Sequence, residues 1–146
     1  MKKAIYFSLA LALLLLASAE KAFACSCPVI PGPEKKQVQQ AFSGSVAIFS
    51  GEVLEISDSS TDINIWLVKF KVAKSWKGDL NGEVTITTAK NSAMCGYSFE
   101  IGKQYLVYAN GARDALMVTN CSRTSKMSNK GDVKYLAKLK RQQRVK

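Results

Sequence analysis

The stretch from Val46 to Ile56, VAIFSGEVLEI, decides the fold class of this chain. It is a long run rich in β-branched and large apolar residues, with Gly51 in its middle. This composition is typical of a β-strand, and a glycine inside a strand marks a bend or the close approach of another backbone. Residues 46–56 therefore predict a long strand that bends sharply where a small barrel closes.

Four more segments downstream have strand character. Residues 63–72 alternate, with one face formed by Trp66, Val68, Phe70 and Val72. Lysines occupy the other face of this segment, so its aromatic residues are expected to pack in the core and not to form a nucleic-acid surface. The remaining predicted strands are 83–88, which follows a turn around Asn81-Gly82, then 104–109 and 116–119.

Two segments outside the strands have helical character. Residues 34–42 are polar and predict a short helical turn, while Val133, Leu136 and Leu139 lie at helical spacing within residues 132–143. The second segment predicts a terminal helix packed on the barrel. Five short strands, a bent first strand and a C-terminal helix predict a mainly β fold, namely a Greek-key barrel of the OB type.

The first 24 residues resemble a secretory signal peptide. Lys2 and Lys3 precede an apolar run over residues 4–17, and Ala22-Phe23-Ala24 is a small-x-small cleavage site. The run is shorter than the roughly 20 residues that cross a bilayer, so no membrane span is expected. We therefore predict a signal peptide at residues 1–24, a mature domain at residues 25–146, and a secreted or periplasmic protein.

The residue after the predicted cleavage site, Cys25, leaves an alternative open. In a bacterial lipoprotein the cysteine at this position carries lipid on its sulfur and anchors the protein to a membrane. Lipoprotein signals usually have leucine where this chain has Ala22 and a small residue where it has Phe23. The sequence therefore favours an unmodified Cys25.

Composition limits the function. The chain has no histidine, which excludes a histidine-based catalytic triad and an HExxH zinc site, and no other nucleophile-and-base set is visible. An enzyme is therefore not expected, nor is a cofactor. Removing residues 1–24, with their three lysines and one glutamate, lowers the net charge only from +10 to +8. Such a charge favours association with acidic surfaces, whether polysaccharide, phospholipid or nucleic acid.

All four cysteines, Cys25, Cys27, Cys95 and Cys121, lie in the predicted mature domain. An even number of cysteines in an exported chain predicts disulfides. A zinc site is disfavoured because Cys-Ser-Cys is a tighter spacing than structural zinc motifs use. Of the three possible pairings, the one that joins Cys25 to Cys27 would close a strained small ring, so two long-range bridges are expected.

The ordered set of motifs resembles the N-terminal domain of the tissue inhibitors of metalloproteinases, and the signal sequence looks bacterial. The motifs are Cys25-Ser26-Cys27, Ala41-Phe42, Trp76-Lys77-Gly78, Met94-Cys95-Gly96-Tyr97 and Leu116-Met117-Val118-Thr119-Asn120-Cys121-Ser122. The resemblance implies a netrin-like OB fold. It also implies bridges from Cys25 to Cys95 and from Cys27 to Cys121.

The same resemblance implies a function, which is inhibition of a zinc metalloendopeptidase. The α-amine and carbonyl of Cys25 would chelate the catalytic zinc of the protease, and Ser26 would point into its specificity pocket. Cys27 and Pro28 would continue along the cleft, with Ser92, Ala93 and Met94 beside them. We expect a monomer. The alternative is a non-inhibitory binding module of the envelope or extracellular space that uses its basic surface for polyanions.

Overall fold

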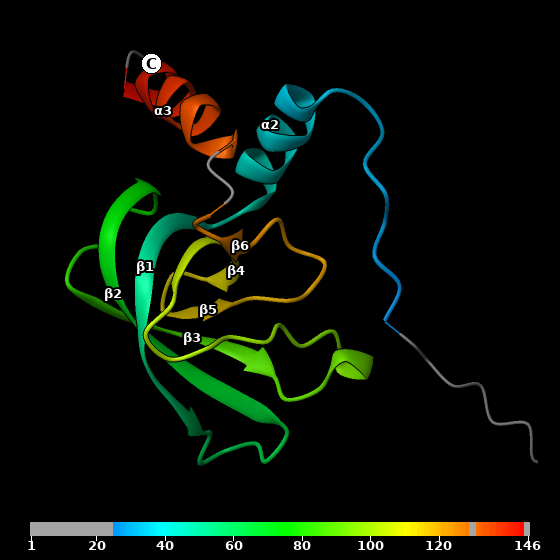
Figure 1. Ribbon diagram of the computed structural model, residues 1–146, viewed down its shortest axis with the longest axis vertical. Coiled ribbons are helices and arrows are strands. Elements are labelled where there is room, and N and C mark those ends of the chain that lie inside the picture. The colour runs from blue at the N-terminus through cyan, green and yellow to red at the C-terminus, as the bar shows by residue number, and fades with distance from the viewer. Residues whose placement is uncertain (1–24, 129–130, 145–146) are drawn as a thin grey trace, which may run out of the picture.

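The computed structural model describes residues 25–128 and 131–144, so the predicted signal peptide lies outside the described residues. The elements, in chain order, are α2 (Glu34–Gly44), β1 (Ala47–Asp58), β2 (Ile65–Lys77), β3 (Glu83–Ala89), the short 3₁₀ turn η1 (Ser92–Met94), β4 (Gln104–Ala112), β5 (Ala115–Met117), β6 (Ser125–Lys126) and α3 (Gly131–Arg144). Figure 1 shows the two helices side by side at one end of a β-barrel.

Five strands close the barrel. They are hydrogen-bonded in the order β1-β2-β3-β5-β4, and β4 pairs back with β1. All of these pairings are antiparallel except the short one between β3 and β5, and β6 adds a two-residue pairing to β4. The predicted mainly β, five-stranded barrel with a C-terminal helix is confirmed.

Strand β1 closes the barrel because it pairs with two neighbours. Residues 47–52 pair with β4, whereas pairing with β2 runs from Ile48 to Asp58, with a register shift between Ser50 and Gly51. A Cβ atom on Gly51 would lie 2.8 Å from the carbonyl oxygen of Lys71 on β2. Only glycine fits this close approach without a shift of backbone, which confirms the interpretation of Gly51 as the residue at the bend.

The apolar residues form two clusters. The first fills the barrel and includes Phe49, Phe70 and Tyr105, each 0% exposed. The second lies between the barrel and the helices and consists of Val38, Phe42, Ile48, Trp76, Leu106, Tyr108 and Leu136. The ring centroids of Phe70 and Phe49 lie 5.5 Å apart in an edge-to-face arrangement. The predicted core role of the aromatic face of residues 66–72 is thus confirmed.

The bounds of several elements differ from the sequence prediction; the strand expected at 116–119, for example, is β5 at Ala115–Met117, and the larger differences concern α2 and β2. The segment expected to form a short helical turn is the 11-residue helix α2, because Val38 and Phe42 are buried in the second cluster. Strand β2 continues to Lys77, since its last residues pair with β1 after pairing with β3 has ended at Lys71 and Glu83. Asn81 and Gly82 therefore belong to a wider connection than a two-residue hairpin.

Among the described residues, no helix is long and apolar enough to cross a bilayer.

Candidate functional site

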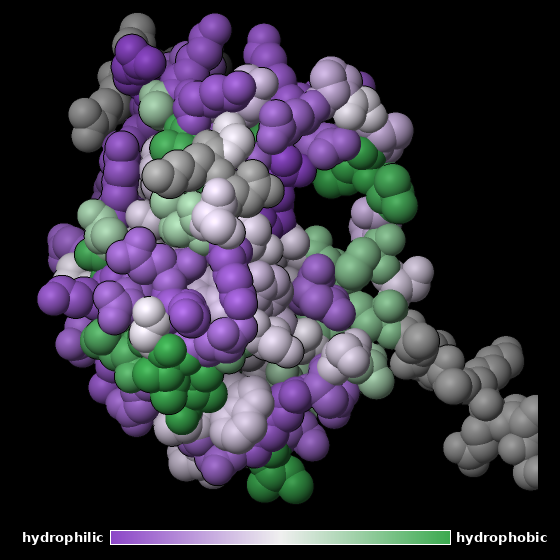
Figure 2. Space-filling model, viewed as in Figure 1, coloured by the Kyte–Doolittle hydropathy of each residue, from purple (hydrophilic) through white to green (hydrophobic). Residues whose placement is uncertain are grey.

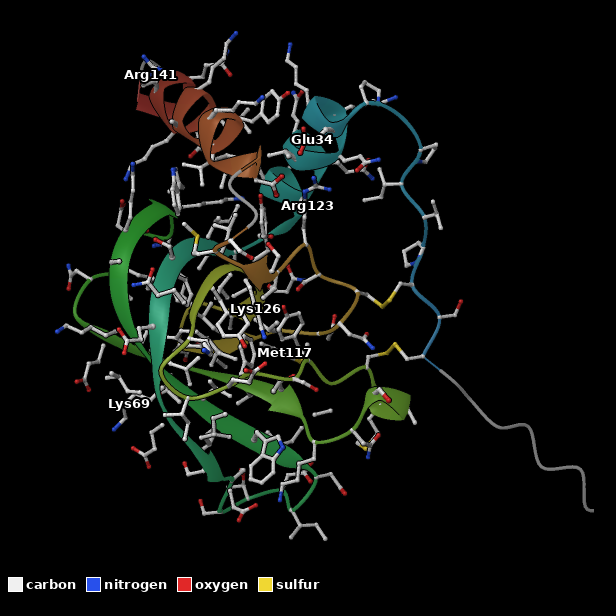
Figure 3. All side chains as sticks on the ribbon, in the orientation of Figure 1. Glu34, Lys69, Met117, Arg123, Lys126 and Arg141 are labelled. Atoms are coloured by element: carbon white, nitrogen blue, oxygen red, sulfur yellow. A yellow bond between two sulfur atoms is a disulfide. The ribbon has the colours of Figure 1, made fainter. Side chains whose placement is uncertain are left out.

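Two disulfides fix the first described residues to the barrel. Cys25 is bonded to Cys95 and Cys27 to Cys121, with Cα separations of 5.2 and 5.0 Å. Figure 3 shows both bridges as yellow bonds at one side of the barrel. The pairing implied by the family resemblance is confirmed. We call residues 25–28 the pinned edge.

The sulfur atoms at this edge are close together, yet they form no metal site. The sulfurs of Cys25, Cys27 and Cys121 all lie within 4.8 Å of one another. Each is consumed in a disulfide, so no thiolate is left to ligate a metal. If the edge meets a metal, the backbone atoms must supply the ligands.

The loop that carries Cys95 is shaped by local polar contacts. The side-chain oxygen of Asn91 accepts a hydrogen bond from the Met94 amide at 2.9 Å, which closes the turn of residues 92–94. A Cβ on Gly96 would lie 2.0 Å from the carbonyl oxygen of Ala89, so only glycine lets the loop turn back against β3. This steric limit explains the glycine of the Cys95-Gly96 motif.

The second cysteine loop is joined directly to the first. The Asn120 amide donates to the Cys95 carbonyl at 2.9 Å, and the side-chain oxygen of Asn120 lies 3.2 Å from the sulfur of Cys25. Asn120, which precedes Cys121 in the second loop, thus contacts both the first loop and the pinned edge. Asn120 belongs to the motif of residues 116–122, but its residue type alone did not predict this contact.

The predicted protease-binding residues lie at one side of the molecule and face solvent. Ser26, Cys27 and Pro28 are exposed, and Cys25 is half-buried. The turn formed by Ser92, Ala93 and Met94 is also exposed and immediately precedes Cys95, the bridge partner of Cys25. The structure therefore brings the two predicted segments together, although 63 residues separate Pro28 from Ser92 along the chain.

Beyond Pro28 the chain is bonded to the side chain of Gln37 on α2. The amide nitrogen of Gln37 donates to the carbonyl oxygens of Ile30 and Gly32, at 3.1 and 3.0 Å. Figure 2 shows a hollow between this segment and the body of the molecule, and its lining includes Val29, Gln37, Tyr108 and Arg123. Residues 28–30 therefore border this hollow, and Gln37 holds the chain at its edge.

Gln37 is in turn part of a polar network. Arg123 donates to the side-chain oxygen of Gln37 at 3.1 Å and to both carboxylate oxygens of Asp132, at 2.7 and 2.9 Å. The Tyr108 hydroxyl donates to Asp132 at 2.8 Å. Because Tyr108 lies on β4 and Asp132 on α3, the network joins the N-terminal segment, both helices and the barrel.

The ionisation of this network follows from the burial of Tyr108 and from the hydrogen bonds that Arg123 makes to Asp132. Burial first, and then the hydrogen bond to the negative Asp132, raise the pKa of Tyr108 far above its ordinary value. The hydrogen bonds to Asp132 raise the pKa of Arg123. Tyr108 is thus neutral and Arg123 positive at every physiological pH. Sequence reasoning missed the network, because its members are far apart in the chain and each is of a common surface type.

The barrel and its bridges define a class of protein: a netrin-like OB domain in which two disulfides hold the largely exposed segment of residues 25–28. The chain is similar to metalloproteinase inhibitor 2 of the dog, Canis lupus familiaris, with 36% identity over 125 residues, which is 77% of this chain and 54% of that protein. The resemblance to the N-terminal domain of the tissue inhibitors of metalloproteinases is thereby confirmed. No family model matches the sequence.

The extent of the match limits what it carries. The chain spans about half the length of the inhibitor that it matches, 54%. What the name of that inhibitor says of its activity and partner therefore comes to this chain only as a proposal. The assignment of the signal sequence to a bacterial type stays a prediction.

Proposed function

We propose that residues 25–146 are the mature form of an exported, monomeric inhibitor of zinc metalloendopeptidases, and that it acts through the pinned edge. One observation carries the proposal: two disulfides hold residues 25–28, which are exposed from Ser26 on, beside an exposed turn at residues 92–94. The similarity to a metalloproteinase inhibitor supports it. We assign no catalysis to the chain, because its sequence contains no histidine with which to build an acid-base site.

The chemistry of the edge suits zinc. Removal of residues 1–24 would leave the α-amine of Cys25 beside its own carbonyl oxygen, and together these form a bidentate chelating group. A catalytic zinc keeps one position for water, and an α-amine with a pKa of about 8 loses its proton at little cost. The disulfides fix this group before binding, so little conformational entropy is lost when the complex forms.

The neighbouring residues take the remaining roles in this proposal. Ser26 has a small side chain, exposed beside Cys25, that would enter the specificity pocket of the protease. Cys27 and Pro28 would follow the cleft, since the bridge to Cys121 fixes Cys27 to the barrel. Ser92, Ala93 and Met94 would contact the protease next to them.

Export without lipidation is part of the same proposal. A lipid thioether at Cys25 would use the sulfur that bonds to Cys95, so the bridge and the lipid exclude each other. We therefore expect the purified mature protein to have the intact mass of residues 25–146 with two disulfides. An added diacylglyceryl group would contradict the proposal.

The decisive test moves the amine of Cys25. Adding one alanine before Cys25 shifts the terminal amine by about 3.5 Å, while the bridges and the barrel stay as they are. We expect the melting temperature to be unchanged and inhibition of metzincin-type zinc endopeptidases to fall by at least about 100-fold, because chelation requires the amine at the zinc. Ser26→Gly keeps the amine in place and should change only the preference among proteases.

Two results would count against chelation. Equal inhibition by the mature and extended proteins would show that the position of the amine does not matter. Inhibition by neither, combined with salt-sensitive retention on a polyanion column, would favour the alternative of a non-inhibitory polyanion-binding module.

A further inference from the structure

A groove runs between the two helices, away from the pinned edge. Its residues come from both helices and from the end of β2, and they are Lys35, Gln39, Phe42, Ser43, Lys77, Tyr135, Lys138, Leu139, Arg141, Gln142 and Gln143. Two depressions make up this lining, and they share Gln39, Lys138, Leu139 and Gln142, so they are continuous. We call this feature the helix-pair groove.

The groove is cationic. Lys35, Lys77, Lys138 and Arg141 line it, and no aspartate or glutamate does. The ion pairs of the described residues lie elsewhere and use Lys69, Lys90, Arg123 and Lys126. Within the described part of the chain, none of the groove cations therefore has a carboxylate partner. Figure 2 shows the helical end of the molecule as predominantly hydrophilic.

The cations are placed by the helices that carry them. Lys138 and Arg141 are three residues apart on α3, so their side chains lie on the same face. Lys77 donates from its ammonium to the carbonyl oxygens of Phe42 and Ser43, at 2.8 and 3.3 Å, and this holds its charge at the C-terminal end of α2. Burial lowers the pKa of Lys77 from 10.5, as is expected of an ammonium partly removed from water.

The uncharged lining indicates the kind of polyanion. Gln39, Gln142 and Gln143 are exposed carboxamides, which both donate and accept hydrogen bonds and therefore suit hydroxyl groups. The aromatic residues offer little face for a base to stack on, because Phe42 is only 5% exposed and the ammonium of Lys134 lies over the half-buried ring of Tyr135, 4.9 Å from its centroid. A flat bilayer surface would touch the rim of a groove but not its floor.

We propose that the helix-pair groove binds an acidic polysaccharide, with cations on its carboxylate or sulfate groups and carboxamides on its hydroxyls. A linear chain with repeated negative charges matches a groove whose several positive charges have no carboxylate partner among the described residues. The site shares no residue with the pinned edge, so one molecule can hold a protease and a polysaccharide at once. The proposal does not depend on the inhibitory function.

The test compares two double variants that lose the same charge. Lys138→Gln/Arg141→Gln removes two cations from the groove, and Lys71→Gln/Lys103→Gln removes two exposed cations from the barrel. Binding of heparin and of polygalacturonate is measured by titration calorimetry at several salt concentrations. Two lost charge contacts should weaken binding by about ten-fold at low salt and make the slope of log K against log salt shallower by about two, by analogy with counterion release from nucleic acids.

The control variant should bind within about two-fold of the unmodified protein, and both variants should keep its melting temperature. An equal loss in the two variants would overturn the proposal, because the effect would then be one of net charge. Tighter binding to vesicles of phosphatidylcholine and phosphatidylglycerol than to either polysaccharide would also overturn it, in favour of a membrane surface. Inhibition of proteases is not measured in this experiment, so a failure here leaves the proposed inhibitory role standing.

Discussion

The pinned edge and the helical layer of α2 and α3 are ordered by opposite means. At the edge, Ser26, Cys27 and Pro28 are exposed, and order comes from two covalent bonds. In the helical layer no described residue is in a disulfide, and order comes from buried apolar side chains such as Val38 and Leu136, each 0% exposed. The difference shows how a segment can be rigid while its backbone stays free for a partner: covalent anchors replace the burial that would otherwise cover it.

The largest expected effect comes from removing the bridge at Cys25. In Cys25→Ser/Cys95→Ser the cross-link across 70 residues is lost, and the free energy of unfolding should fall by about 2–5 kcal/mol. Both cysteines are replaced because a free Cys25 thiol would lie 3.6 Å from the sulfur of Cys121 and could attack the second bridge. Urea denaturation measures the loss.

The comparison also predicts where this loss appears. Exchange through local opening should rise in residues 92–96, whereas in α2 and α3, whose order depends on burial, exchange should rise only as far as the lower global stability requires. If local exchange rose in α2 and α3 as much as in residues 92–96, the two regions would not be independent. A stability within about 0.5 kcal/mol of the unmodified protein would show that the bridge does not constrain the unfolded chain.

What could be predicted from the sequence follows the same division. The barrel was predictable because strand alternation and Gly51 are local signals, and the bridges were predictable through a motif pattern shared with a family. Helix α2 was underestimated because its apolar residues are few, and Val38 becomes buried only when the barrel and α3 are beside it. The network of Arg123 and Asp132 could not be predicted, since no local pattern marks a contact between distant polar residues.

A smaller effect, dependent on pH, is expected from the network that joins the helical layer to the barrel. Tyr108 is 1% exposed and donates to Asp132, so Tyr108→Phe should cost about 2 kcal/mol at neutral pH through the loss of a buried hydrogen bond to a charge. The folded state raises the pKa of Tyr108 above its ordinary value of 10.0. Its contribution to stability is therefore fully present below pH 10 and is lost as the pH rises through the folded-state pKa.

The measurement is the free energy of unfolding from neutral pH to about pH 11, made rapidly enough to preserve the disulfides. Because the folded state also raises the pKa of Tyr97 and Tyr105, both proteins should lose stability above pH 10, and the unmodified protein should lose more. The gap between them at neutral pH should narrow as the pH rises. A constant gap at every pH would mean that Tyr108 ionises equally in the folded and unfolded chains.

The smallest effect is expected between the two regions, where residues 28–33 leave the pinned edge and enter α2. Gln37→Ala removes the hydrogen bonds to Ile30 and Gly32 and the one accepted from Arg123, and should lower stability by only about 1 kcal/mol, because these bonds are partly exposed. Elastase should cut between Val29 and Ile30 several-fold faster than in the control Gln40→Ala, which changes an exposed residue of the same helix. The cut is read by mass after reduction, since the bridges retain the fragment.

Inhibition of a zinc endopeptidase by uncut Gln37→Ala then separates covalent from non-covalent order. If the bridges alone position the amine of Cys25, inhibition should stay within about two-fold of that of the unmodified protein while residues 28–33 loosen. A ten-fold loss would correspond to about 1.4 kcal/mol of binding free energy. Such a loss would mean that the helical layer helps to hold the edge through Gln37, so that the two regions are ordered jointly.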